Sequence, residues 1–216
     1  MMDHSRTQAA LRGLVFIFVF VLPFGFAPPS AAAETEERAG SFIRSLATEA
    51  MESLTQEDAP RNKRIQRFRK LFNDHFAVRS IGRFVLGRTW RKASKEEQTE
   101  YLKLFEDLMV VSYVDRFTRY AGKNLTITRT RAESAKSTTV FSEINTANTG
   151  KPVQVLWRVG SLGKVMKIVD VIVEGASMSQ TLRSDFGSII RQKDGKVSGL
   201  IEELRKKTAT LKASAP

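Results

Sequence analysis

The chain has no cysteine and only two histidines among its 216 residues. Without cysteine, disulfides, thiolate metal sites and cysteine nucleophiles are excluded. His4 lies in a segment that we expect to be removed, so a histidine-rich metal site is excluded, and so is any catalytic triad not built on His75. The sequence also contains no P-loop, no dinucleotide-binding fingerprint and no serine elbow. We therefore expect no catalytic residues, no metal and no cofactor.

Acidic residues are too few to balance the basic ones, and the formal net charge is +12. A basic surface of this size favours anionic partners. The chain carries no nucleic-acid-binding motif, and its N-terminus predicts export from the cytoplasm, so we expect no nucleic acid among its partners. Anionic lipid head groups or an acidic protein surface are better candidates. The plainer alternative is a source whose proteins are generally basic.

The N-terminus has the pattern of a secretory signal peptide. Arg6 and Arg12 precede an apolar run from Leu14 to Phe26, and Ala31-Ala32-Ala33 then offers a small-x-small cleavage site. The apolar run is shorter than the roughly 20 residues that span a membrane, and Pro23 interrupts it. We expect residues 1–33 to be a signal peptide, cleaved near Ala33-Glu34, and residues 34–216 to be one domain. An uncleaved membrane anchor is the alternative.

The periodicity of apolar residues changes twice along the chain, from helical to alternating and back to helical. It predicts helices over residues 34–54, 62–76, 78–86 and 94–120, then strands over 125–131, 137–146, 152–159 and 165–173, then helices over 177–192 and 198–207. Short connections, including a turn at Asn148-Thr149-Gly150, favour an antiparallel meander of four strands. The prediction is an α+β fold with helices packed against one four-stranded sheet.

The stretch Val165–Val173 is apolar on both faces, so both faces need a cover. Gly175 breaks this strand, and Ser177 starts a helix with the capping-box spacing to Gln180. Asp170 and Glu174 share one face of the strand, and we expect them to pair with basic neighbours, with Arg183 as the obvious partner.

The predicted helix over residues 94–120 has an apolar side wider than the usual core-facing stripe of about 100°. Ser94 and Glu97 form a second capping box at its start. We expect this helix to be buried on more than one side. Its apolar surplus and that of the last strand either pack on each other as a plain core or form the walls of a cavity for a large apolar ligand.

Three blocks of sequence resemble the MlaC family, also called the toluene-tolerance family. The first is His75–Arg91, which contains Val85-Leu86-Gly87 and Trp90-Arg91; the second is the capped helix from Ser94; the third is Asp170–Phe186. Together they cover roughly residues 64–207. The chain departs from the family pattern with Ala77 in place of Asp, and with Met166 and Val169 in place of Trp and Tyr.

The resemblance implies a periplasmic phospholipid-binding protein that needs no reactive group. It implies an NTF2-like arrangement, in which the tails of the lipid lie in a pocket between the helices and a curved four-stranded antiparallel sheet. Members of the family carry phospholipid between an outer-membrane lipoprotein–porin complex and an inner-membrane ABC transporter complex, for which they act as the substrate-binding component, and so maintain the lipid asymmetry of the outer membrane. A related branch occurs in hopanoid-producing bacteria, and a hopanoid-branch lipid carrier is an alternative.

The apolar surplus and the resemblance together give a predicted set of lipid-binding residues. The sequence does not decide which face of the last strand lines the pocket. The set is Phe84, Val85, Leu104, Phe105, Leu108, Val111, Tyr113, Phe117, Val155, Trp157, Val169, Val171 and Val173. Two competing functions remain. A small isomerase-like enzyme would need Asp170 or His75 inside the pocket, and a structural or adaptor protein would have a dry core.

Overall fold

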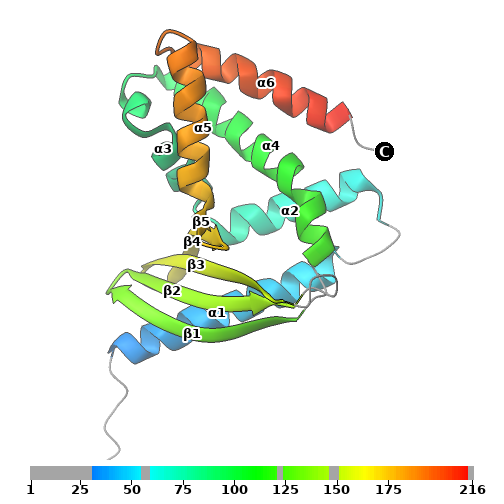
Figure 1. The fold of residues 1–216 in the computed structure, drawn as a ribbon, viewed down its shortest axis with the longest axis vertical. Helices are drawn as coiled ribbons and strands as arrows, with labels where there is room; N and C mark the ends of the chain where they lie inside the picture. Colours follow the sequence, from blue (N-terminus) through cyan, green and yellow to red (C-terminus); the bar gives the residue numbers. More distant parts are fainter. Residues whose placement is uncertain (1–30, 55–58, 121–123, 146–150, 214–216) are drawn as a thin grey trace, which may run out of the picture.

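The structure, a computed structural model, describes residues 31–54, 59–120, 124–145 and 151–213, without the side chains of residues 116–120. The predicted signal peptide up to Ser30 and the predicted turn at residues 148–150 lie outside these ranges. The order of elements confirms the α+β class (Figure 1). The elements are α1 (Ala31–Leu54), α2 (Arg61–His75), α3 (Val78–Leu86), the 3-10 helix η1 (Gly87–Arg91), α4 (Lys95–Tyr120), β1 (Leu125–Ser134), β2 (Ser137–Ile144), β3 (Val153–Leu162), β4 (Val165–Val173), β5 (Ala176–Ser177), α5 (Met178–Gln192) and α6 (Val197–Ala213).

The sheet has five strands rather than the predicted four. Its order is β1-β2-β3-β4-β5, and every neighbouring pair is antiparallel. The extra strand arises because the chain does not leave the sheet at Gly175. Glu174 (φ 48°) and Gly175 (φ 82°) form a two-residue hairpin turn instead, which returns the chain to pair along β4. The predicted antiparallel meander is confirmed, with one strand more than expected, while the NTF2-like arrangement stays a prediction.

A β-bulge in β4 decides which side chains share a face. Arg158 pairs with Asp170 and the next residue, Val159, pairs with Ile168, so Val169 is the extra residue. The alternation of side chains therefore shifts by one position at the bulge. Val171 lies beside Trp157 and Ile168 beside Val159, on the same face of the sheet. The simple odd-and-even pattern read from the sequence misses this shift.

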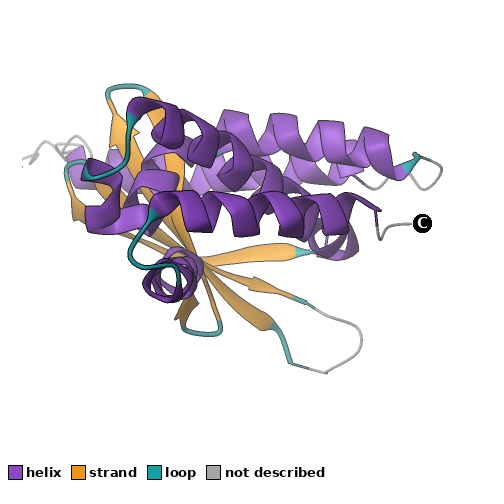
Figure 2. Ribbon diagram, turned by 90° about the horizontal axis from the view of Figure 1, so that it is seen from above, coloured by secondary structure: helices purple, strands orange, loops and turns teal. Residues whose placement is uncertain are grey.

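Helices cover this inner face of the sheet (Figures 1 and 2). α1 packs on β1 and β2, while α2, α3 and α5 contact β4. α4 lies away from the sheet, where it packs against α2, α3 and α6. Both sides of α4 are buried, as its wide apolar stripe predicts: Tyr101, Phe105, Val110 and Val114 are all fully buried. Burial raises the pKa of the Tyr101 hydroxyl, which donates to the Gly82 carbonyl oxygen at 2.9 Å.

The predicted helix starts follow from their capping residues. Glu97 N–H donates to Ser94 Oγ at 3.2 Å, and the Glu97 carboxylate accepts from Ser94 N–H at 2.9 Å, which completes the predicted capping box. Gln180 N–H likewise donates to Ser177 Oγ at 3.2 Å at the start of α5. The last helix is longer than the predicted range of residues 198–207, because α6 continues to Ala213.

Gly87 ends α3, as predicted, and lets a side chain from α5 approach closely. Its backbone has φ 60° and ψ −133°, a combination that suits glycine. A Cβ at this position would lie 2.8 Å from the Arg183 guanidinium. That guanidinium donates to the Phe84 carbonyl oxygen at 2.7 Å and so satisfies a free carbonyl at the end of the helix. Arg183 therefore joins α5 to α3. The sequence-based prediction that it pairs with Asp170 is wrong, because Asp170 meets Arg158 instead.

The basic side of α2 is largely neutralised within the molecule. Arg69 binds Glu106 at 2.7 Å and Asp107 at 2.6 Å, and Lys212 of α6 reaches Asp107 at 3.2 Å. Partial burial opposes ionisation of Asp107, but the hydrogen bonds and charges of these two cations prevail and lower its pKa. The group ties α2, α4 and α6 together. No helix among the described residues is long and apolar enough to cross a membrane.

Candidate functional site: an apolar cavity between helices and sheet

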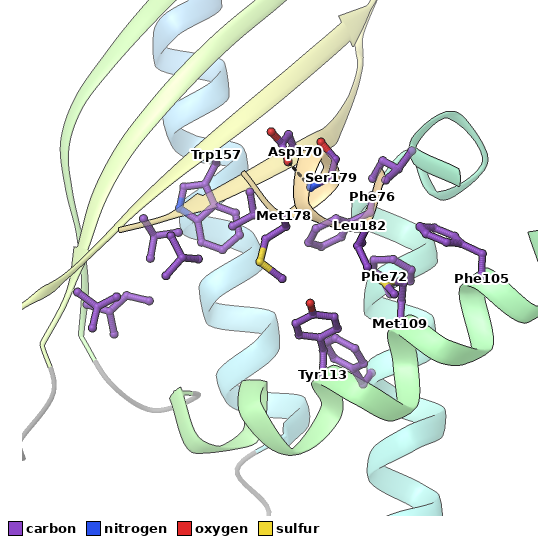
Figure 3. Close-up of a pocket in the computed structure, with 17 residues that line it drawn as sticks. Phe72, Phe76, Phe105, Met109, Tyr113, Trp157, Asp170, Met178, Ser179 and Leu182 are labelled. Atoms are coloured by element: carbon purple, nitrogen blue, oxygen red, sulfur yellow. Dashed lines mark hydrogen bonds between the residues drawn. The ribbon is translucent and has the colours of Figure 1, made fainter. Parts of the chain in front are cut away.

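A cavity of about 510 Å³ lies between the inner face of the sheet and helices α2 to α5 (Figure 3). Its size falls in the range of natural ligand sites, about 300–1,000 Å³. Nearly all its lining side chains are apolar. They are Phe68, Phe72, Phe76, Ile81, Phe105, Met109, Tyr113, Ile144, Val153, Val155, Trp157, Asp170, Val171, Val173, Met178, Ser179 and Leu182.

The sheet wall is built by alternate residues of neighbouring strands. Val155 pairs with Val173 and Trp157 with Val171 across β3 and β4, so the four side chains form one continuous apolar surface. The indole N–H of Trp157 donates to Ser142 Oγ at 2.9 Å. Because this polar atom is satisfied inside the sheet, the ring presents an apolar surface to the cavity.

The helix wall comes from residues spaced four apart. Phe68, Phe72 and Phe76 follow one stripe along α2 and its C-cap, with ring centroids 6.2 Å and 4.9 Å apart between successive rings. Phe105, Met109 and Tyr113 form the equivalent stripe of α4, and Met178 and Leu182 come from α5. Methionine is unbranched and adaptable, so the two methionines give part of this wall freedom to fit different apolar shapes.

One carboxylate lines this cavity among the described residues, and it is already engaged. Asp170 is buried, and its Oδ1 accepts from the Ser179 backbone N–H at 3.0 Å. Its Oδ2 accepts from Ser177 Oγ at 2.7 Å and meets the Arg158 guanidinium at 3.5 Å. Figure 3 shows Asp170 and Ser179 together at one end of the cavity. The carboxylate stabilises the N-terminus of α5, where a negative charge is favourable.

A second cavity of about 1020 Å³ lies between α4, α5, α6 and the start of α2. Met109, Tyr113 and Leu182 line both cavities, so at most a single layer of side chains separates the two. Its inner wall is apolar. Its charged lining residues carry charges of both signs, and they are Arg61, Arg64, Asp115, Asp185, Glu203, Lys206 and Lys207.

The structure brings about half of the predicted lipid-binding residues to the first cavity. Those are Phe105, Tyr113, Val155, Trp157, Val171 and Val173. Leu108 and Val111 line the second cavity, together with Tyr113. The structure therefore selects the face of β4 that carries Val171 and Val173.

The other predicted residues lie elsewhere. Val85 is buried in the core and Leu104 packs against it without lining either cavity. Val169 is the bulge residue and packs beside Gly160. Phe84 is 45% exposed on the outer side of α3. The side chain of Phe117 lies outside the described residues.

Sequence reasoning missed three of the six aromatic side chains that line the first cavity, all of them on α2 and its C-cap. The spacing of Phe68, Phe72 and Phe76 identifies an apolar stripe but gives no sign that it faces a cavity rather than a filled core. An enzyme would need Asp170 or His75 inside the pocket. Asp170 does line the cavity, but its carboxylate is already held by Ser177, Ser179 and Arg158. His75 is absent from the cavity lining, and its Nε2 meets the Glu49 carboxylate at 2.7 Å. The described residues contain no group of three or more acidic or histidine side chains that could hold a metal ion.

Comparisons with known proteins agree with this architecture. A solved phospholipid-binding protein from Ralstonia solanacearum, in complex with a phospholipid, matches with a TM-score of 0.67 and 22% sequence identity, over 79% of this chain and 97% of that one. At this identity the likeness establishes the fold. No curated protein sequence matches the chain. A family model described as MlaC protein matches residues 44–206. Because that match spans well over half of its length, the chain belongs to the MlaC family.

Proposed function

We propose that this protein is a periplasmic carrier that binds one phospholipid with its acyl tails in the first cavity and along the apolar wall of the second. The observation that carries the proposal is the first cavity itself, an almost wholly apolar space between helices and sheet. The solved Ralstonia protein of similar fold holds a phospholipid. A lipid with two tails needs more space than a drug-sized site offers, and the second cavity supplies that additional space.

The energetics of lipid transfer match such a site. A phospholipid has on the order of 30 methylenes at about 0.8 kcal/mol each, so exposing its tails to water costs roughly 25 kcal/mol. A carrier in an aqueous compartment must therefore enclose the tails almost completely. It also must release them, so its affinity for the tails must stay close to that of a bilayer. Apolar walls without a strong head-group clamp meet both requirements, and the cavity walls here are of that kind.

The same proposal covers location and route. Residues 1–33 serve as a cleaved signal peptide, and residues 34–216 act in the periplasm as a single lipid-binding domain. The carrier moves phospholipid between an outer-membrane lipoprotein–porin complex and an inner-membrane ABC transporter complex, and so maintains the lipid asymmetry of the outer membrane. Membership of the MlaC family supports this route.

Transfer of labelled phospholipid between two vesicle populations tests the carrier function. Residues 34–216 should accelerate transfer in proportion to protein concentration while the vesicles themselves stay intact. Transfer no faster than the spontaneous rate, from protein that still unfolds cooperatively, would contradict the proposal.

A further inference from the structure

A second feature of the molecule has no role in the cavity. Between Phe76 and Lys95 the chain carries five basic residues and no acidic residue. The segment comprises α3, η1 and the approach to α4, and it lies at one corner of the helical layer beside α5 (Figure 1). So dense a run of one charge costs self-repulsion, and it therefore invites a functional explanation.

These cations differ from several of those of α2, which have acidic partners. In α2, Arg61 and Arg64 meet Asp115, and Arg69 meets two carboxylates. Among the described residues no salt bridge involves any basic side chain of α3 or η1. The guanidiniums there are exposed and available to an external anion.

An exposed aromatic ring lies among these cations. Phe84 is 45% exposed, one of the four large apolar side chains that the described residues leave exposed. The Arg183 guanidinium lies 5.0 Å from its ring centroid and is fixed there by its bond to the Phe84 carbonyl. The Arg83 guanidinium likewise lies 5.4 Å from the Trp90 ring. The surface thus combines cations with a rigidly placed apolar group.

We propose that this surface docks the protein on an anionic phospholipid bilayer. We call it the α3–η1 patch and define it as Phe84 with Arg79, Arg83, Arg88, Arg91, Lys92 and Arg183. The inference goes beyond the carrier function, since it concerns how the protein meets a membrane and does not depend on what the cavity holds.

The chemistry of the patch favours a bilayer over an acidic protein. Five of its six cations are arginines, whose planar guanidinium matches phosphate oxygens two at a time. A lone aromatic ring surrounded by cations suits the boundary between head groups and acyl chains, where the ring is buried while the charges stay at the phosphates. None of the patch residues lines either cavity described above, so the patch is a surface distinct from both.

Sedimentation with vesicles tests the proposal. Residues 34–216 should bind vesicles that contain phosphatidylglycerol and leave pure phosphatidylcholine vesicles unbound, with binding weakened by salt. The triple variant Arg79→Ala, Arg88→Ala, Arg91→Ala should lower partitioning roughly 100-fold, since each cation near an anionic surface contributes about a factor of five. The matched control is Lys136→Ala, Lys164→Ala, Lys196→Ala, which removes three exposed cations elsewhere.

Two comparisons decide the outcome. An equal loss of binding in the two triple variants would overturn the patch and leave only net charge. For the aromatic group, Phe84→Ala should weaken binding more than Leu162→Ala, although Leu162 is the more exposed at 78%. The reverse order, or binding to an acidic protein with none to vesicles, would also overturn it.

The carrier function is judged separately. The arginine triple variant should keep its bound lipid, measured by native mass spectrometry, and its circular dichroism spectrum. If wild-type protein retains its lipid but does not bind anionic vesicles, the docking surface is refuted and the carrier function is not.

Discussion

A charge placed in the sheet wall of the first cavity should expel the lipid. Val171 is half-buried and lines that cavity beside Trp157, so Val171→Glu puts a carboxylate against the acyl tails. Burying the ionised carboxylate would cost far more than burying a neutral group, so the glutamate takes up a proton when lipid is bound, and the neutral carboxyl without a hydrogen-bond partner still costs about 1–3 kcal/mol. That cost corresponds to lipid retention weakened roughly 5- to 150-fold. Native mass spectrometry of purified protein, before and after incubation with empty vesicles, measures the fraction that still carries lipid.

The neighbouring strand offers a matched control. Leu156 lies on the opposite face of the sheet, in a shallow groove that it shares with Arg129, Arg131 and Arg158. A glutamate there faces cations rather than tails, so Leu156→Glu should keep its lipid. Full retention in Val171→Glu, with loss in Leu156→Glu, would show that the lipid lies on the other face and would refute the assignment of the cavity.

Three further predictions concern stability. Gly87→Ala forces an unfavourable backbone conformation on alanine and brings its Cβ to 2.8 Å from Arg183. The substitution should cost roughly 1–3 kcal/mol of stability. It should also lower the melting temperature more than Gly163→Ala, because Gly163 has the same φ of 60° but no atom within 4 Å of an added Cβ. Asp170→Ala leaves a buried amide of α5 without an acceptor and should cost about 1–3 kcal/mol in urea unfolding; an unchanged midpoint would contradict the capping role. The folded-state pKa of Asp107 lies below its unfolded value, so its ionised form stabilises the fold above about pH 4, and this stabilisation is lost as the pH falls through the folded pKa. Asp107→Asn should therefore lose less stability than wild type between pH 5 and about pH 2, and parallel curves would contradict this.

Local sequence signals predict most of the secondary structure. The switch from helical to alternating periodicity locates the sheet, because both patterns reflect which side chains are buried. Capping residues such as Ser94 and Ser177 fix helix starts through hydrogen bonds that span only three residues. Signals of this range can be read without knowledge of the tertiary structure.

Features that depend on distant partners could not be predicted in the same way. The bulge at Val169 depends on the register between β3 and β4, and it moves Ile168 to the face of Val171. The turn at Gly175 is visible in the sequence, but the pairing of β5 that follows it is not. One-residue shifts of this kind change the face on which a side chain lies, and hence what it can bind.

The cavity shows the same limit. An apolar stripe has the same pattern whether it packs against a filled core or borders an empty space, so the phenylalanines of α2 were missed. The prediction for Phe84 is wrong in the opposite direction. An aromatic residue in an apolar segment is expected in the interior, but Phe84 is exposed. The partner of Arg183 proved to be a backbone carbonyl of α3, which no charge pattern predicts.

The most direct test of the account is native mass spectrometry of residues 34–216 after export to a bacterial periplasm, with organic extraction of whatever co-purifies. The account predicts one diacyl phospholipid per chain. A polycyclic terpenoid from a host that makes one would instead assign the protein to the hopanoid branch. A folded protein that arrives empty and takes up no phospholipid from vesicles would contradict the central claim that the cavity is a lipid site.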